Sequence, residues 1–96
     1  MPVRSPRHEA FGWTIRALRQ RRGMSQEALA AKCELDRTYI SGIERGTRNP
    51  SLTNILKIAD SLSVSASELF AAAQSRHDAV AGKLVEPRRR RADSRA

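Results

Sequence analysis

Apolar residues recur every three or four positions along most of residues 8–73, which is the spacing of one face of an α-helix. Side chains that favour helix starts and glycines that favour helix ends divide this pattern into five segments. The sequence has no alternation of apolar and polar residues of the kind that predicts β-strands, and no internal repeat. The pattern therefore predicts an all-α domain of five helices.

Short polar side chains mark where most of these helices begin, because an oxygen at the N-cap position accepts from the free backbone N–H groups of the first turn. The caps that we expect for the second to fifth helices are Ser25, Asp36, Ser51 and Ser65. The first helix is expected from about residue 8 to residue 21. The residues expected to face the core are Phe11, Ile15, Leu18, Leu29, Ala30, Cys33, Ile40, Ile43, Leu52, Ile55, Leu56, Ala59 and Leu62. The apolar residues of the fifth helix are Leu69, Phe70 and Ala73.

The composition predicts one small domain. The chain has 96 residues, of which 40% are hydrophobic and 4% aromatic, and this fits a modest helical core. No apolar run approaches the roughly 20 residues that span a bilayer, and the N-terminus lacks the apolar stretch of a signal peptide. We expect the domain in residues 8–75, between a flexible N-terminus (1–7) and a basic, disordered tail (76–96).

Net charge of +8 suggests nucleic acid or another acidic surface as a partner. Residues 8–73 hold nine basic and seven acidic side chains, whereas residues 74–96 hold seven basic and three acidic ones. The tail therefore supplies half of the excess charge. The arginine run at residues 88–91 is either a solubilising terminus or an arm that binds phosphates, and the sequence leaves both interpretations open.

The third predicted helix has a polar outer face. With Ile40 and Ile43 directed inward, the helical period places Arg37, Thr38, Ser41, Gly42 and Arg45 outside. Arginine can donate to guanine through two N–H groups, threonine offers a hydroxyl and a methyl group, and glycine lets a backbone approach closely. Because this helix follows a capped partner helix after a tight turn, the arrangement is typical of a helix that enters the DNA major groove.

The chain resembles a known family along about two-thirds of its length. The matching residues are Gly23–Ala30, Ile40, Ile43, Glu44, Gly46, Asn49–Ser51 and Leu62–Phe70. From about residue 11 to residue 70 the chain is similar to the phage repressor/Cro-type family of helix-turn-helix domains, also called the xenobiotic-response-element family. Residues 36–52 are most similar to the restriction–modification controller proteins within it. Two positions where the family commonly has glycine hold Glu34 and Ser63 instead, so we expect an unfavourable backbone at Glu34.

The outer face and the resemblance together imply a homodimeric regulator that binds a palindromic or pseudopalindromic operator in double-stranded DNA. The base-reading residues expected are Arg37, Thr38, Tyr39 and Ser41. The phosphate-binding residues expected are Gln26, Arg45, Thr47, Arg48 and Asn49. The resemblance further implies a buried ion pair between Arg19 and Glu44. We expect Leu69 and Phe70 at the dimer interface, since one face of the fifth helix cannot bury both against a small core.

An enzyme, a cofactor site and a metal site are not expected. The sequence has no nucleophile elbow, no glycine-rich phosphate loop and no paired metal ligands. His8 and His77 fall in segments expected to lie apart, and Cys33 falls on an inward face as a small apolar filler. The resemblance places the protein in the bacterial cytoplasm, on the nucleoid. An antitoxin or adaptor whose tail binds a protein partner is the alternative; its apolar anchors would be Val80, Leu84 and Val85.

Overall fold

Five α-helices make up the part of the chain that this computed structural model describes, residues 4–82, and no strand occurs there. They are α1 (Pro6–Arg21), α2 (Gln26–Cys33), α3 (Arg37–Glu44), α4 (Leu52–Ser61) and α5 (Ala66–Ala81). The predicted all-α class with five helices is confirmed. None of the helices described is long and apolar enough to cross a membrane.

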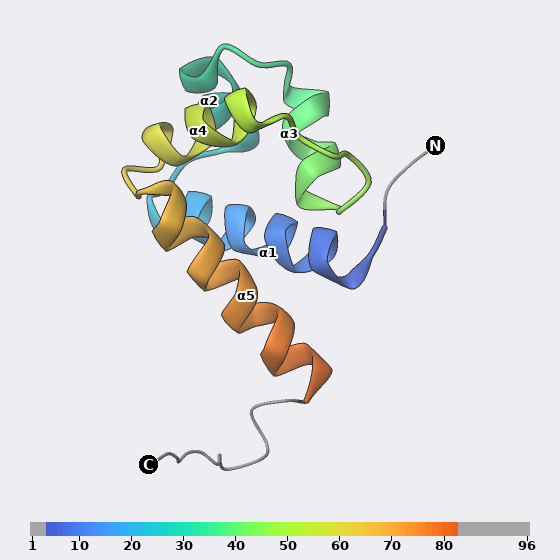
Figure 1. The fold of residues 1–96 in the computed structure, drawn as a ribbon. Helices are drawn as coiled ribbons and strands as arrows, with labels where there is room; N and C mark the ends of the chain where they lie inside the picture. Colours follow the sequence, from blue (N-terminus) through green and yellow to red (C-terminus); the bar gives the residue numbers. More distant parts are fainter. Residues whose placement is uncertain (1–3, 83–96) are drawn as a thin grey trace.

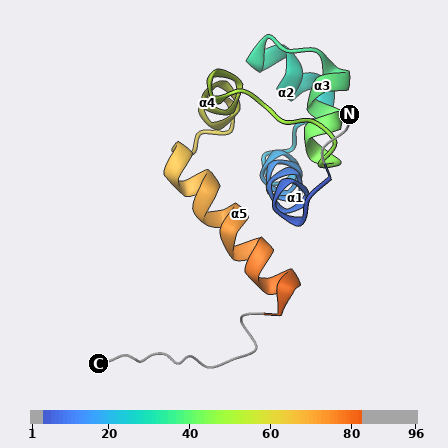
Figure 2. The same ribbon diagram turned by 45° about the vertical axis from the view of Figure 1, so that its right-hand side comes forward.

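α1 lies at the centre of the arrangement (Figure 1). It packs against α3 on one side and α5 on the other, while α2 contacts both α3 and α4. Figure 2, in which α1 is seen nearly end on, shows α5 running past it and away from the other helices. α2 and α3 therefore lie on the opposite side of α1 from the C-terminal end of α5.

A polar side chain caps every helix. Ser5, Ser25, Ser51 and Ser65 each accept from a backbone N–H three residues later, and Asp36 accepts from one two residues later. The four predicted caps are therefore confirmed. α1 begins two residues before the predicted start, because Ser5 caps it and Pro6 suits the first helical position.

Seven large side chains are fully buried and form the centre of the core: Ile15, Leu29, Ile40, Ile43, Ile58, Leu62 and Leu69. The face predicted for α4 is wrong in part. Leu52 and Leu56 are 67% and 44% exposed, whereas Ile58, which was not predicted, is completely buried. The covered residues Ile55, Ile58, Ala59 and Leu62 keep the spacing i, i+3, i+4, i+7 of one helical face, and the contacts of α4 with α2 and α5 leave Leu52 and Leu56 at the exposed edge of that face.

α5 continues to Ala81, six residues beyond the predicted end of the domain at residue 75. Its last turns lie against α1, where the guanidinium of Arg76 stands 4.0 Å from the centroid of the Trp13 ring. This contact joins residues that are far apart in the sequence. It stabilises the C-terminal half of α5, where the apolar pattern of the helix is weak. The expectations for the arginine run and for Leu84 and Val85 lie outside the described residues.

Two non-glycine residues adopt left-handed backbone conformations. Glu34, at the end of α2, has φ of 59°, and Ser63, after α4, has φ of 60°. The unfavourable backbone expected at Glu34 is therefore present, at a cost on the order of 1 kcal/mol. The turn between α2 and α3 keeps the geometry that a glycine would give.

Candidate nucleic-acid interface

α2 and α3 are joined by a three-residue turn, and the turn is anchored to both helices. The backbone N–H of Leu35 donates to the carbonyl of Ala30 at 2.9 Å, which closes the end of α2. Asp36 then caps α3 by accepting from the N–H of Thr38 at 3.1 Å. Leu35 packs against the core between them. The second helix of the pair is thus held at a defined angle to the first.

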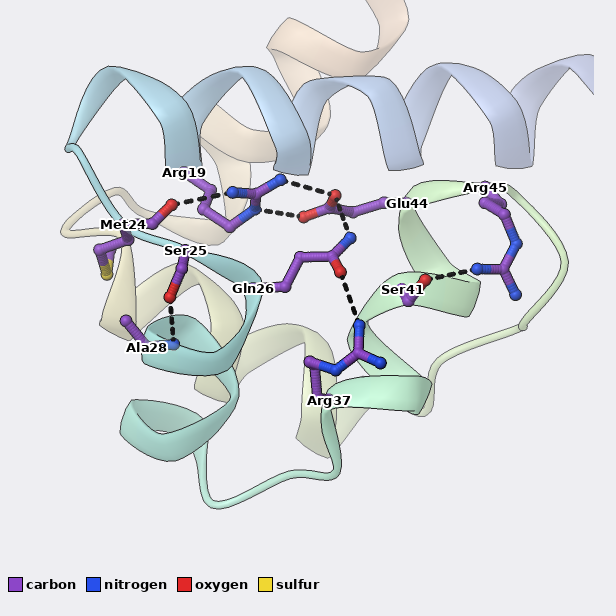
Figure 3. Close-up of polar contacts among 9 residues, drawn as sticks. All are labelled: Arg19, Met24, Ser25, Gln26, Ala28, Arg37, Ser41, Glu44 and Arg45. Atoms are coloured by element: carbon purple, nitrogen blue, oxygen red, sulfur yellow. Dashed lines mark hydrogen bonds and ion pairs between the residues drawn. The ribbon is translucent and has the colours of Figure 1, made fainter.

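The outer face of α3 exposes most of the side chains predicted to meet DNA. Arg37, Thr38 and Arg45 are exposed, and Ser41 is partly exposed between them. Arg45 donates from Nη1 to the hydroxyl of Ser41, one helical turn earlier (Figure 3). Because guanidinium and hydroxyl groups donate to phosphates and base edges, this face can bind DNA along the length of α3.

Gly42 does not belong to the exposed face, and its predicted role in a close approach to DNA is wrong. It is buried, and its carbonyl accepts from both the backbone N–H and the hydroxyl of Thr47, at 2.9 and 3.1 Å. A Cβ atom at Gly42 would lie 2.5 Å from Cγ of Arg48. The glycine therefore makes room for the loop that follows α3.

This loop, residues 45–49, brings four predicted phosphate-binding residues to one end of α3. The guanidinium of Arg48 stands 5.4 Å from the centroid of the Tyr39 ring, and Asn49 is exposed beside it in sequence. Tyr39 is only partly exposed, since its hydroxyl accepts from Asn54 of α4 at 3.1 Å. The ring of Tyr39 thus supports Arg48 at the edge of the exposed face.

An ion pair fixes the other side of α3 to α1. Arg19 donates from Nε and Nη2 to the carboxylate of Glu44, at 2.6 and 3.0 Å, and from Nη1 to the carbonyl of Met24 at 2.8 Å (Figure 3). The two side chains are 10% and 4% exposed. The hydrogen bond to Glu44 raises the pKa of Arg19 above its ordinary value. The same carboxylate also accepts from Gln26, which the sequence did not predict.

The two residues predicted for a dimer interface lie in different environments. Leu69 is completely buried within the chain, so it cannot present a surface to a second copy, and that part of the prediction is corrected. Phe70 is 47% exposed, with its ring centroid 5.7 Å from that of Phe11. The exposed apolar residues Leu52 and Leu56, on α4, were expected in the core.

A cavity of about 320 Å³ lies beside the two phenylalanine rings. His8 and His77 both line it, although the sequence placed them in separate regions, and Asn49 and Phe70 do so as well. The packing of α5 along α1 brings the two histidines together, and no local sequence signal indicates it. Within residues 4–82, no group of three or more histidine, cysteine or acidic side chains could hold a metal ion.

A capped pair of helices that exposes a polar second helix beside a basic loop defines a helix-turn-helix DNA-binding domain. The family model for helix-turn-helix domains matches residues 15–69, and the chain belongs to this family of transcription regulators. Control protein C.BamHI from Bacillus amyloliquefaciens is 55% identical over 61 residues, which cover 62% of this chain and 75% of that protein.

Solved structures show the same relationship. The restriction–modification controller protein C.AhdI from Aeromonas hydrophila matches with a TM-score of 0.64 and 50% identity, over 65% of this chain and 94% of that one. The restriction–modification controller protein C.Esp1396I, solved as a tetramer in complex with its natural 35-base-pair operator, matches with a TM-score of 0.70 and 38% identity, over 76% and 96%. The predicted resemblance to controller proteins is confirmed.

Proposed function

We propose that this chain is a sequence-specific regulator of transcription that binds a palindromic or pseudopalindromic operator in double-stranded DNA as a homodimer. Its similarity to C.AhdI and C.Esp1396I supports a further step: the regulated promoter is that of a restriction–modification system and drives the regulator's own gene. Such a protein acts on the bacterial nucleoid by binding, without catalysis and without a cofactor.

The exposed face of α3 carries this proposal. The residues that read base edges are Arg37, Thr38, Tyr39 and Ser41. The residues beside this face that contact the phosphate backbone are Gln26, Arg45, Thr47, Arg48 and Asn49. The first group lies on α3 itself, where side chains reach the floor of a major groove, and most of the second lies at the two ends of the helix pair. The ion pair of Glu44 with Arg19 keeps this surface fixed relative to the core.

The dimer follows from the geometry of DNA. Two recognition helices meet successive major-groove faces of one side of a duplex when they stand about 34 Å apart across a two-fold axis. The half-exposed ring of Phe70 on α5 is the anchor that we propose for this contact. A symmetric dimer in turn requires a symmetric operator.

Selection of bound fragments from random duplex DNA tests the function. We expect enrichment of an inverted repeat whose half-sites are centred about one helical turn apart, or a multiple of it. The same selection with Arg37→Ala serves as the control and should enrich a degenerate site, since a base contact is lost. Enrichment of a single unrepeated motif would contradict the dimer, and no enrichment by the wild-type chain would contradict sequence-specific binding.

A further inference from the structure

The cavity beside the two phenylalanine rings has a largely apolar lining. Phe11 of α1 and Phe70 of α5 contact each other there, with their ring centroids 5.7 Å apart, and Pro50, Ile55 and Ala73 add to the apolar surface. Its volume of about 320 Å³ lies at the lower end of the range of cavities that bind small molecules, which are lined mainly by apolar and aromatic side chains. The cavity can therefore hold one small molecule with an apolar body.

Basic side chains line the same cavity. They are Arg7 and His8, in the first turn of α1, and His77, in α5. None of the residues that line it, all within the described part of the chain, is acidic. Arginine keeps its positive charge in proteins, and both arginine and histidine donate hydrogen bonds through N–H groups. The charge of the lining is thus complementary to a small anion.

A hydrogen bond between α1 and α5 holds Arg7 at this cavity. Its Nη1 donates to Oε1 of Gln74 at 2.8 Å, which uses one of the five N–H groups of the guanidinium. The planar shape of this group suits a carboxylate, which can accept from two N–H groups at once. Nδ1 of His77 lies 3.5 Å from Oδ1 of Asp78, a residue outside the lining, and this contact leaves Nε2 of His77 to a ligand.

We propose that this cavity is a binding site for a small carboxylic acid with an aromatic or branched aliphatic body. The body packs against Phe11 and Phe70, and the carboxylate accepts hydrogen bonds from Arg7 and His77. Removal of the apolar surfaces from water favours binding of any molecule of this shape. The charge-assisted hydrogen bonds favour the acid over an uncharged molecule of the same shape.

Two residues of the cavity connect it to DNA binding. Asn49 belongs to the loop that we propose contacts phosphates, and Phe70 is the proposed anchor of the dimer. A ligand against the ring of Phe70 covers apolar surface that a second copy would otherwise cover, so ligand binding and dimer formation compete. The acid therefore weakens operator binding. This consequence, unlike the binding of the acid itself, rests on the proposed function.

The site is tested on the full-length chain with 1-naphthoate as the probe and 1-naphthamide as its uncharged counterpart. We expect 1-naphthoate to shift the backbone amide NMR signals of Phe11, Phe70 and Ala73 in a saturable way. It should bind roughly tenfold more tightly than the amide, because a hydrogen bond to a charged group contributes about that factor. Equal affinities would overturn the proposed class of ligand, and no saturable shift with either probe would overturn the site.

Arg7→Gln tests the residue assigned to the carboxylate. Arg7 is exposed, so the variant should fold, and it should bind 1-naphthoate about as weakly as the wild type binds 1-naphthamide. Arg16→Gln removes another exposed arginine of α1, one that does not line this cavity, and should bind the probe like the wild type. Losses of the same size in both variants would show an effect of net charge and contradict the assignment.

The competition is measured with the operator that selection identifies. Saturating 1-naphthoate should lower operator affinity at least about fivefold, which is the lower end of typical coupling between two sites, and sedimentation should shift toward the monomer. Arg7→Gln should respond weakly to the same concentration. Bound probe with unchanged operator affinity would overturn the competition. A chain that prefers no duplex would contradict the proposed function, whereas a chain that selects an operator and binds no probe would contradict this inference alone.

Discussion

Arg19 and Glu44 meet through two parallel hydrogen bonds, from Nε to Oε2 at 2.6 Å and from Nη2 to Oε1 at 3.0 Å. They come from α1 and α3 and are 25 residues apart. The pair joins the last residue of α3 to α1, which also packs against α5. The position of α3 relative to the rest of the domain therefore depends on this pair.

Removing one partner of this pair should destabilise the protein strongly. Glu44→Ala leaves the guanidinium of Arg19 buried without its counter-charge, which we expect to lower the free energy of unfolding by about 3–5 kcal/mol. Urea denaturation measures the change. The exposed pair of Arg4 and Glu9, at 3.3 Å, is the control, and Arg4→Ala should cost less than about 1 kcal/mol. Equal effects of the two substitutions would show that burial does not matter here.

A methyl group added at Gly12 should push α1 away from α3. A Cβ atom there would lie 2.2 Å from the carbonyl oxygen of Ile43 and 2.5 Å from that of Glu44, and backbone atoms cannot step aside. We expect Gly12→Ala to cost at least about 1–3 kcal/mol. Gly42→Ala meets chiefly the flexible side chain of Arg48 and should cost less. Thermal unfolding of the two variants compares them, and the reverse order would contradict this packing.

Arg37 and Arg48 should differ in what they contribute to DNA binding. Arg37→Ala should lose about 1–3 kcal/mol on the operator and little on scrambled DNA, because a base contact carries sequence information. Arg48→Ala should weaken both complexes and lower the slope of log affinity against log salt by about 1, since one phosphate contact is lost. Salt titrations on both duplexes measure these quantities. Equal losses for Arg37→Ala on both duplexes would make it a phosphate contact.

Acid should weaken the start of α5 through Glu68. Hydrogen bonds from the backbone N–H and the hydroxyl of Ser65 lower the pKa of Glu68. A lowered pKa means that the stabilisation is present above the ordinary carboxyl value of about 4.3 and is lost as the pH falls through the lower folded-state value.

Glu68→Gln keeps a hydrogen-bond acceptor but cannot titrate. The wild type should therefore have the higher melting temperature at pH 6, and the difference should shrink as the pH falls below the ordinary carboxyl value of about 4.3 and vanish once Glu68 is protonated in the folded state as well. Glu27→Gln, in the first turn of α2, controls for the helix dipole. A wild-type advantage that persists in acid, or that Glu27→Gln reproduces in full, would exclude the hydrogen bonds between Ser65 and Glu68 as its cause.

The helices could be predicted because their starts are encoded locally. Ser25, Asp36, Ser51 and Ser65 each cap the helix that the sequence assigned to them, and each does so within three residues. The edge of a buried face depends instead on neighbouring helices. The apolar stripe of α4 includes Leu52, Leu56 and Ile58, and the contacts of α4 with α2 and α5 cover Ile58 but leave the two leucines exposed.

The same distinction holds at the DNA-facing surface. The exposure of Arg37 and Thr38 follows from the helical period once Ile40 is inside. The burial of Gly42 does not, because it depends on how the loop after α3 folds back. Nor could the contacts of Gln26 be predicted, since its partners are 11 and 18 residues away on two turns of α3.

Phe70 should determine the oligomeric state. Its ring is 47% exposed, although aromatic rings of this size gain much free energy from burial, and a second copy placed by a two-fold axis would cover it. Phe70→Asp puts a charge at that contact. We expect a monomer by sedimentation velocity, and much weaker operator binding, because each half-site must then be bound separately.

The control for this substitution comes from the same helix. Val80 is 67% exposed, so Val80→Asp adds the same charge to α5 and should leave the dimer intact. Phe70 also packs against Phe11, so circular dichroism must first show that the Phe70→Asp chain is folded. A folded variant that remains dimeric would exclude Phe70 as the anchor. The exposed pair Leu52 and Leu56 on α4 would then be the next surface to substitute, because these two neighbouring leucines are 67% and 44% exposed.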